Sequence, residues 1–174
     1  MDDEHTNPLQ LFLRNLEQNV ALNREDRRAV LALPYRLRKL EPATYLTREG
    51  DLPEHCGVIC SGFAYRQKHT GDGLRQILSL HIPGDAVDLQ HLYLEVADHS
   101  VQMLTRGEVA FVHRKDLRDL AAERPNVGRA MLINIQIDAS IFREWVLNVG
   151  RRDARARLSH VLCEFATRMN RQQL

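Results

Sequence analysis

The sequence predicts an α+β protein in which a compact antiparallel β-structure is flanked by helices on both sides. Apolar residues have helical spacing before position 34 and again after position 113, and short runs bounded by turn residues fill the stretch between them. Many short strands with tight turns are typical of a sandwich, a jelly roll or a small barrel. A chain of 174 residues suffices for one such domain with additional helices.

Composition places the chain among ordinary globular proteins. It is 44% hydrophobic and 27% charged with a net charge of +1, and its longest apolar runs are far shorter than the roughly 20 residues that span a bilayer. Residues 1–4, Met-Asp-Asp-Glu, are acidic where a signal peptide would be basic, so we expect a cytoplasmic location without membrane attachment. Three cysteines, an odd number, favour reduced thiols over a disulfide framework.

Residues 1–33 are predicted to form N-terminal helices. Asn7-Pro8 is a typical helix start, and Asn23 can cap a second helix that ends before Pro34. The apolar positions of these two helices are Leu9, Phe12, Leu13 and Leu16, then Ala29, Val30 and Leu33.

Residues 34–125 carry the β pattern. Turn signals such as Gly71-Asp72-Gly73 and Pro83-Gly84-Asp85 separate the strand candidates. In the run 74–82, Leu74, Leu78, Leu80 and Ile82 share one face and Arg75, Ser79 and His81 the other, so one side of this strand should lie inside. The predicted strands cover 35–40, 43–46, 56–60, 63–69, 74–82, 99–105 and 108–113.

A long helix is predicted over 126–149. Its apolar residues form a row with alternating spacings of three and four, as in the seam of a coiled coil. A second apolar row runs beside it, so one row should pack on the barrel and the other on a second copy in a parallel homodimer; a helix buried within a monomer is the alternative. The seam comprises Leu132, Ile135, Ala139, Phe142, Val146 and Val149, and the second row Ile133, Ile137, Ile141 and Trp145.

Gly150 is expected to end the long helix. A further helix is then predicted from Arg151 to Met169. Its apolar face comprises Ala154, Leu158, Val161, Leu162 and Phe165.

Four segments, taken in this order, resemble the Crp/Fnr superfamily of bacterial transcription regulators. They are Ser61-Gly62, Asp-Gly-Leu-Arg-Gln-Ile-Leu at 72–78, Ile-Pro-Gly-Asp at 82–85, and Val-Gly-Arg-Arg-Asp-Ala-Arg-Ala-Arg-Leu at 149–158. The resemblance covers nearly the whole chain. It implies a double-stranded β-helix (jelly-roll) barrel of cyclic-nucleotide-binding type, with short N-terminal helices and a long C-terminal dimerisation helix.

The resemblance also implies an organisation and a function. Residues 34–125 would be the sensor barrel, 126–149 the dimerisation helix, and 150–174 a hinge and the first helix of a DNA-binding domain that is otherwise missing from this sequence. The chain would be the effector-sensing and dimerisation part of a DNA-binding regulator, with an unknown small-molecule effector. A stand-alone dimeric ligand-binding or interaction module is the alternative. No DNA-contacting residue is assigned; the arginines of 151–174 could follow phosphates or form a solvated helix face.

The resemblance places a ligand-binding cassette after the Pro-Gly-Asp turn. Relatives that bind cyclic AMP have Gly-Glu-Leu and later Arg-Ser-Ala, where this sequence reads Asp88-Leu89-Gln90 and His99-Ser100-Val101. A buried phosphate needs a cation or several amide donors, and histidine lacks the planar fork of arginine. We therefore predict no ordinary cyclic-AMP binding, and either another ligand or a vestigial pocket. The candidate ligand-binding residues are Gly84, Asp88, Leu89, Gln90, His99 and Ser100.

Other chemistry is not indicated. His81, His91 and His99 lie around the cassette and could serve as haem or metal ligands, but no pair has metal-motif spacing. No cysteine precedes Cys56, which disfavours the iron–sulfur branch of the superfamily, and we expect Cys56, Cys60 and Cys163 to be buried structural thiols. No cupin, P-loop or Ser-His-Asp pattern is present, so we predict no enzyme, no cofactor and no metal site.

Overall fold

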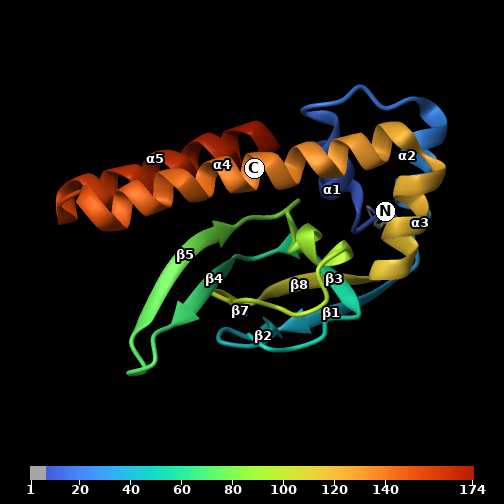
Figure 1. Cartoon of the computed structure of the whole chain (residues 1–174). Helices are drawn as coiled ribbons and strands as arrows, with labels where there is room; N and C mark the ends of the chain where they lie inside the picture. The colour runs from blue at the N-terminus through green and yellow to red at the C-terminus, as the bar shows by residue number, and fades with distance from the viewer. Residues whose placement is uncertain (1–6) are drawn as a thin grey trace, which may run out of the picture.

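The computed structural model describes residues 7–174, and the acidic residues 1–4 lie outside this part of the chain. Two four-stranded antiparallel sheets face each other, with strand orders β1-β8-β3-β6 and β2-β7-β4-β5 (Figure 1). The predicted α+β jelly-roll architecture is confirmed. The strands are β1 Tyr35–Leu40, β2 Tyr45–Thr47, β3 His55–Ser61, β4 Ala64–His69, β5 Arg75–His81, β6 Ala86–Val87, β7 Ser100–Met103 and β8 Gly107–His113.

Seven of these strands match predicted runs, and two elements of the cassette were not predicted. Strand β6 has only two residues, which is too short to show an alternation of apolar and polar side chains. The 3₁₀ helix η1, Leu89–Leu92, follows it after one residue.

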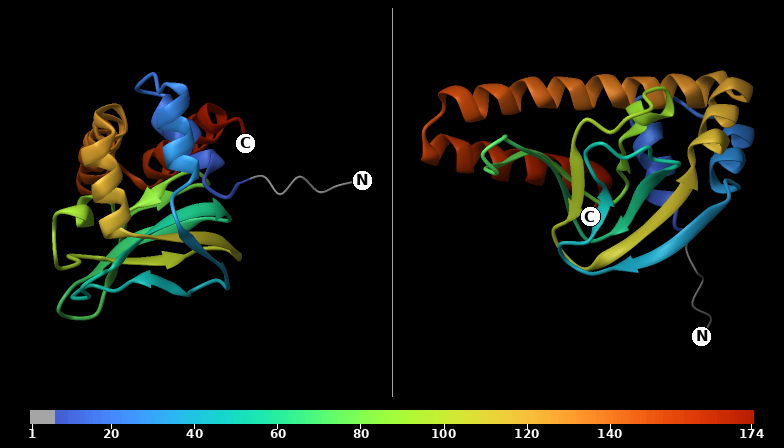
Figure 2. Two further views of the ribbon diagram at one scale, coloured as in Figure 1. Left: turned by 90° about the vertical axis from the view of Figure 1, so that its right-hand side faces the viewer. Right: turned by 60° about the horizontal axis from the view of Figure 1, so that its bottom comes forward.

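The helices gather on one side of the barrel. Helices α1, α2 and α3 lie at one end, α4 runs across the barrel, and α5 turns back beside α4 (Figures 1 and 2). None of the helices in residues 7–174 is long and apolar enough to cross a membrane. Their bounds are α1 Gln10–Glu17, α2 Arg24–Leu31, α3 Arg114–Glu123, α4 Pro125–Arg151 and α5 Ala154–Gln172.

Side chains at the helix ends explain where the helices start and stop. Asn23 caps α2 in a reciprocal capping box with Asp26. The expectation that Gly150 ends the long helix is wrong, because α4 continues through it to Arg151. A single glycine costs a helix only about 1 kcal/mol. The break comes at extended Arg152, after which the Asp153 carboxylate caps α5 by accepting from the amide of Ala156.

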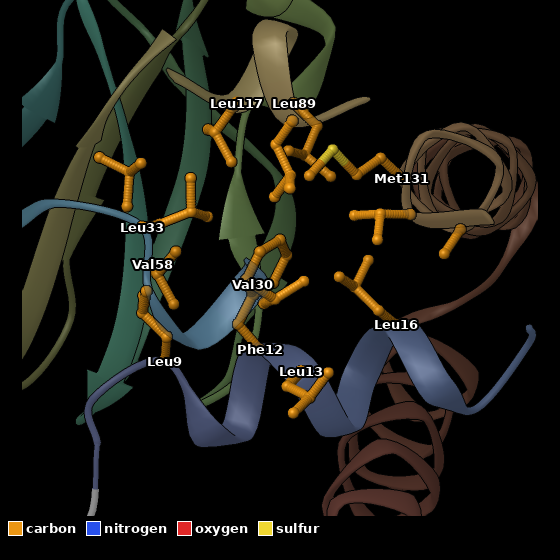
Figure 3. Packing of buried hydrophobic residues seen from close by; sticks show 14 of the residues in the cluster. Leu9, Phe12, Leu13, Leu16, Val30, Leu33, Val58, Leu89, Leu117 and Met131 are labelled. Atoms are coloured by element: carbon orange, nitrogen blue, oxygen red, sulfur yellow. The ribbon is translucent and has the colours of Figure 1, made fainter. Parts of the chain in front are cut away.

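Two apolar clusters hold the molecule together. The larger lies between the helices and the β3 face of the barrel, where Phe12 and Leu16 of α1 meet Val58 of β3, Leu89 of η1 and Met131 of α4 (Figure 3). The smaller fills the barrel interior and comprises Leu40, Ile59, Ala64, Val87, Val101, Met103 and Val109. The cassette is therefore anchored on its apolar side through Leu89.

Two burial patterns differ from expectation. On β5 the inward side is the polar one, since Ser79 and His81 are buried while Leu74 is 67% exposed. On the apolar face, Leu78 and Leu80 are only half-buried. Cys163 is exposed on α5, so the expectation that it is a buried thiol is wrong. Helix α5 lies on the outside of the molecule, and its apolar residues Leu158 and Leu162 are also exposed.

Candidate functional site

The centre of the candidate site is Asp88, between β6 and η1. Its backbone is in the left-handed region, with φ 62° and ψ 44°. The family resemblance places a glycine at this position, and aspartate is one of the few other residues that adopt this conformation routinely. The turn thus keeps its shape while acquiring a buried carboxylate.

The Asp88 carboxylate binds two cationic side chains, Arg66 of β4 and His99, which lies just before β7. Its Oδ1 accepts hydrogen bonds from Arg66 Nη2 at 2.9 Å and from Gln90 Nε2 at 3.2 Å, and lies 2.8 Å from His99 Nε2. The other ring nitrogen of His99 lies 2.7 Å from Asp98 Oδ1. Hydrogen bonds from both nitrogens to carboxylates require two N–H groups, which means the cationic form of the ring.

Arg66 joins this cluster to the long helix. Its second guanidinium nitrogen, Nη1, donates to Asp138 Oδ2 of α4 at 2.9 Å. The Arg66 side chain is only 5% exposed, whereas that of Asp138 is 38% exposed, so the bridge is buried at its barrel end and reaches water at its helix end. Hydrogen bonds between charged groups are shorter and stronger than those between neutral ones.

The charges within the cluster stabilise one another. Burial alone would raise the pKa of Asp88, but the hydrogen bond from His99 and the positive charge of Arg66 hold it well below its ordinary value. Burial alone would lower the pKa of Arg66, but Asp138 and Asp88 raise it. Both groups are therefore ionised at neutral pH.

A second buried ion pair fastens α5 to the turn before the cassette. Arg168 Nη2 donates to the Asp85 carboxylate, and Arg168 Nη1 donates to the carbonyl of Leu80 at 2.7 Å. Burial raises the pKa of Asp85, but Arg168 and His81 outweigh it and lower the pKa to about 2. The turn, its carboxylate and α5 are thus held as one unit.

A cavity of about 110 Å³ lies between these two ion pairs. Its walls come from α1, α4, α5 and the stretch that leads from β5 into η1. Polar and apolar side chains share the lining, which includes Asn15, Gln18, Asn19, His81, Ile82, Asp85, Asp88, Leu89, Gln90, Asn134, Ile135, Ile137, Asp138, Ile141, Arg168, Arg171 and Gln172.

The structure brings only some of the predicted ligand-binding residues together. Gln90 and His99 are each hydrogen-bonded to Asp88, and Leu89 packs in the apolar core. Gly84 lies beneath α5 with φ 95°, and a Cβ there would be 3.0 Å from the carbonyl oxygen of Leu11.

Ser100 faces away from this cluster. Its hydroxyl accepts from the backbone amide of Glu49 at 2.9 Å. It therefore supports the loop after β2 in this structure.

Sequence reasoning missed five charged residues of the site. Asp85 belongs to the Ile-Pro-Gly-Asp segment and His81 was considered only as a metal or haem ligand, so neither was assigned to this site. Asp138 and Arg168 carry no motif of their own, and Arg66 lies in the middle of a predicted strand. A central charge in a short strand is the one signal that could have identified Arg66, because such a residue is almost never buried without a partner. The missed residues are Arg66, His81, Asp85, Asp138 and Arg168.

The two apolar rows of α4 have different surroundings. In the predicted seam, Leu132 and Val146 are 56% and 62% exposed, Ala139 is exposed, and Ile135, Phe142 and Val149 are half-buried. In the second row Trp145 is buried, and its indole donates to Glu164 of α5 at 2.6 Å. One row thus packs within the chain while much of the seam faces outward. Dimerisation through that seam stays a prediction.

No metal centre can be assigned among residues 7–174, since no three histidine, cysteine or acidic side chains there are placed to share an ion. Cys56 is buried, and its thiol donates to the carbonyl of Val87 at 3.0 Å. Burial raises the pKa of this thiol well above its ordinary range. It is a structural, unreactive thiol.

His91 makes stability depend on pH. Its ring is 3% exposed, stacks on His99 and has no hydrogen-bond partner for either nitrogen, and burial lowers its pKa. Below about pH 6.5, His91 binds a proton in the unfolded chain but not in the folded one. The free energy of unfolding therefore falls as the pH is lowered below about 6.5, by up to about 1.4 kcal/mol per pH unit, and is unaffected by His91 above that pH. We expect His91→Phe to remove the part of this acid destabilisation that is due to His91.

Urea unfolding at pH 7 and pH 5.5 checks the prediction. The exposed His69 provides the matched control, His69→Phe, which should retain the wild-type pH dependence. An unchanged pH dependence in His91→Phe would mean that His91 accepts its proton inside the fold.

Comparison with known proteins identifies relatives of this chain. The family model described as "Cyclic nucleotide-binding domain" matches residues 37–124. The transcriptional activator FnrL of Cereibacter sphaeroides is 26% identical over 119 residues, which are 68% of this chain and 47% of the relative. The transcriptional activator Anr of Pseudomonas protegens is 24% identical over 149 residues, 86% of this chain and 61% of the relative.

Solved structures show the same fold. FixK2 from Bradyrhizobium japonicum superposes with a TM-score of 0.72 at 22% identity, covering 78% of this chain and 68% of FixK2. The catabolite activator protein of Thermus thermophilus superposes with a TM-score of 0.63 at 20% identity, covering 78% and 61% of the two chains.

Proposed function

Because the chain belongs to the cyclic nucleotide-binding domain family and to the Crp/Fnr superfamily, we propose that it senses an effector other than cyclic AMP for a transcription regulator. The chain spans about half the length of the curated relatives it matches, 47% of FnrL and 61% of Anr. Contact with DNA is assigned, in this proposal, to a part of the regulator outside residues 1–174.

The observation that carries the proposal is the pairing of Asp88 with Arg66 and His99. A cyclic nucleotide brings a single anionic phosphate, which needs a cationic partner once it leaves water. In this barrel both nearby cations already bind a carboxylate of the chain itself. An incoming phosphate would meet the charge of Asp88 and find its cations occupied. The Asp88 carboxylate thus occupies the cationic partners that a ligand phosphate would need.

The contact between Arg66 and Asp138 supports a role in signalling. It links the site directly to α4, the helix that carries the outward-facing row of apolar residues. A change of charge or ligand beside Asp88 would act on Arg66 and through it on α4. We propose that α4 forms a homodimer along that row, so that the barrel and the dimer interface are coupled.

Calorimetric titration with cyclic AMP and cyclic GMP tests the proposal. Each missing charge-assisted contact costs about 1.5–3 kcal/mol, so losing two should weaken binding at least roughly a hundredfold. We expect no binding of either nucleotide below about millimolar concentration. Micromolar affinity at neutral pH would contradict the proposal.

A further inference from the structure

A second cavity, of about 400 Å³, lies between β1, β2 and the segment 51–54, which leads into β3. Figure 1 shows β1 and β2 on the side of the barrel away from α4 and α5. None of the residues that line this cavity also lines the cavity beside the cassette. Small-molecule sites typically enclose about 300–1,000 Å³, so the second cavity is large enough for an organic ligand.

Two arginines of β1 face this cavity. Alternate side chains of a strand lie on the same face, and Leu40 of β1 packs in the barrel interior, so Arg36 and Arg38 face the interior as well. The Arg38 guanidinium lies over the ring of Phe111, 5.8 Å from its centroid, and Phe111 packs against the interior cluster. Among residues 7–174, neither arginine forms an ion pair or a side-chain hydrogen bond. Both guanidinium groups are therefore available to a ligand.

Two carboxylates, those of Asp51 and Glu54, line the opposite side of the cavity. They belong to the segment before β3, and β8 separates β3 from β1 in the sheet. Neighbouring strands lie about 4.8 Å apart, so the backbones of β1 and β3 are about 10 Å apart, with Phe111 of β8 between them. Asp51 is fixed in place, since its Oδ2 accepts from the backbone amide of Arg48 at 2.8 Å. The positive and negative side chains thus lie on opposite sides of the cavity.

The charges that line this cavity balance one another. The two arginines of β1 face two carboxylates, and His55 adds at most one positive charge. Two further guanidinium groups nearby are directed elsewhere, since that of Arg48 lies on the ring of Tyr45 and that of Arg114 donates to backbone carbonyl groups. A ligand with charge of one sign only would be attracted by one side of the cavity and repelled by the other, whereas a ligand with both charges matches both sides.

We propose that this cavity binds a small zwitterion, an amino acid whose ammonium and carboxylate groups are joined by a short aliphatic chain. Arg36 and Arg38 bind its carboxylate, and Asp51 and Glu54 bind its ammonium group. The ring of Phe111, which lies between the two sides, packs against the aliphatic chain. This site is separate from the cassette and goes beyond the proposed function, which does not depend on it.

Methyl NMR of leucine-labelled protein tests the proposal with 5-aminopentanoate as the probe and with Leu46 and Leu52, which line the cavity, as reporters. Pentanoate and pentylammonium are the matched controls, since each has the same chain length and only one of the two charges. We expect 5-aminopentanoate to shift both leucine signals in a saturable manner at about millimolar concentration. Each control should bind at least roughly tenfold more weakly, because it lacks the charge-assisted contacts of one side. No saturable shift up to about 50 mM, or equal affinity for either control, would overturn the proposal.

Two substitutions test the two sides of the cavity separately. Arg38→Gln and Glu54→Gln should each weaken 5-aminopentanoate binding roughly threefold to tenfold, and both side chains are exposed, so the fold should be retained. Arg106→Gln changes an exposed arginine outside the cavity, which pairs with Glu41, and should leave the affinity unchanged. Unchanged affinity in Arg38→Gln or in Glu54→Gln would place the probe elsewhere and overturn the proposal. Cyclic-AMP binding is measured at a different set of residues, so the two proposals fail separately.

Discussion

Replacing Arg66 with methionine is expected to lower the free energy of unfolding by about 3–5 kcal/mol. The substitution keeps the bulk and apolar stem of the side chain but leaves Asp88 as a buried carboxylate with one of its two cations removed. Removing one partner of a buried ion pair is costly because the remaining charge cannot be solvated. Urea unfolding followed by circular dichroism measures the loss.

The exposed pair of Arg106 and Glu41 provides the control. Its atoms are 3.0 Å apart, but both side chains are more than 60% exposed, so Arg106→Met should cost at most about 1 kcal/mol. Adding Asp88→Asn to Arg66→Met should recover part of the lost stability, since the unpaired charge is then gone. Equal effects of Arg66→Met and Arg106→Met would show that Asp88 is not held by Arg66.

Placing a charge in the α4 seam is the second substitution with a large expected effect. In a dimer formed along the seam, Phe142→Asp would set two carboxylates against each other in an apolar contact, at a cost of several kcal/mol through desolvation and repulsion. We expect light scattering to show a dimer for the wild type at micromolar concentration and a monomer for Phe142→Asp.

Ser140 offers a control on the same helix. It is exposed and lies outside the seam, so Ser140→Asp introduces the same charge nearby and should leave the dimer intact. A monomeric wild type, or a dimer that survives Phe142→Asp, would rule out the seam as the interface.

The sequence predicted the elements whose side chains repeat with a clear period. The strands around Val58 and Val109, the capping of α2 by Asn23 and the length of α4 all follow from local rules. The prediction that Gly150 ends the long helix was wrong because the low helix propensity of glycine is a weak signal. The position of the break is instead marked by Asp153, three residues later, which caps α5.

The chemistry of the site could be predicted only in part. The departure at Asp88 and His99 was visible, because the family resemblance supplies a pattern to depart from. The partners of Asp88 could not be predicted, because they are far apart in the sequence: Arg66 lies 22 positions before Asp88, and Asp138, which Arg66 also binds, lies 72 positions after Arg66. The polar inner face of β5 was missed for the same reason: Ser79 and His81 are buried by packing that no local period encodes.

Titration of Asp88→Gly with cyclic AMP, beside the wild type, tests most directly whether the chain's own carboxylate takes the place of a ligand phosphate. Glycine adopts the left-handed backbone of this position without strain, and Arg66 retains Asp138 as a partner. Asp98→Asn, which alters the exposed partner of His99, is the control and should bind no better than the wild type. The account predicts that Asp88→Gly binds cyclic AMP at least about tenfold more tightly than the wild type. A folded Asp88→Gly variant with no gain, or micromolar binding by the wild type, would contradict it.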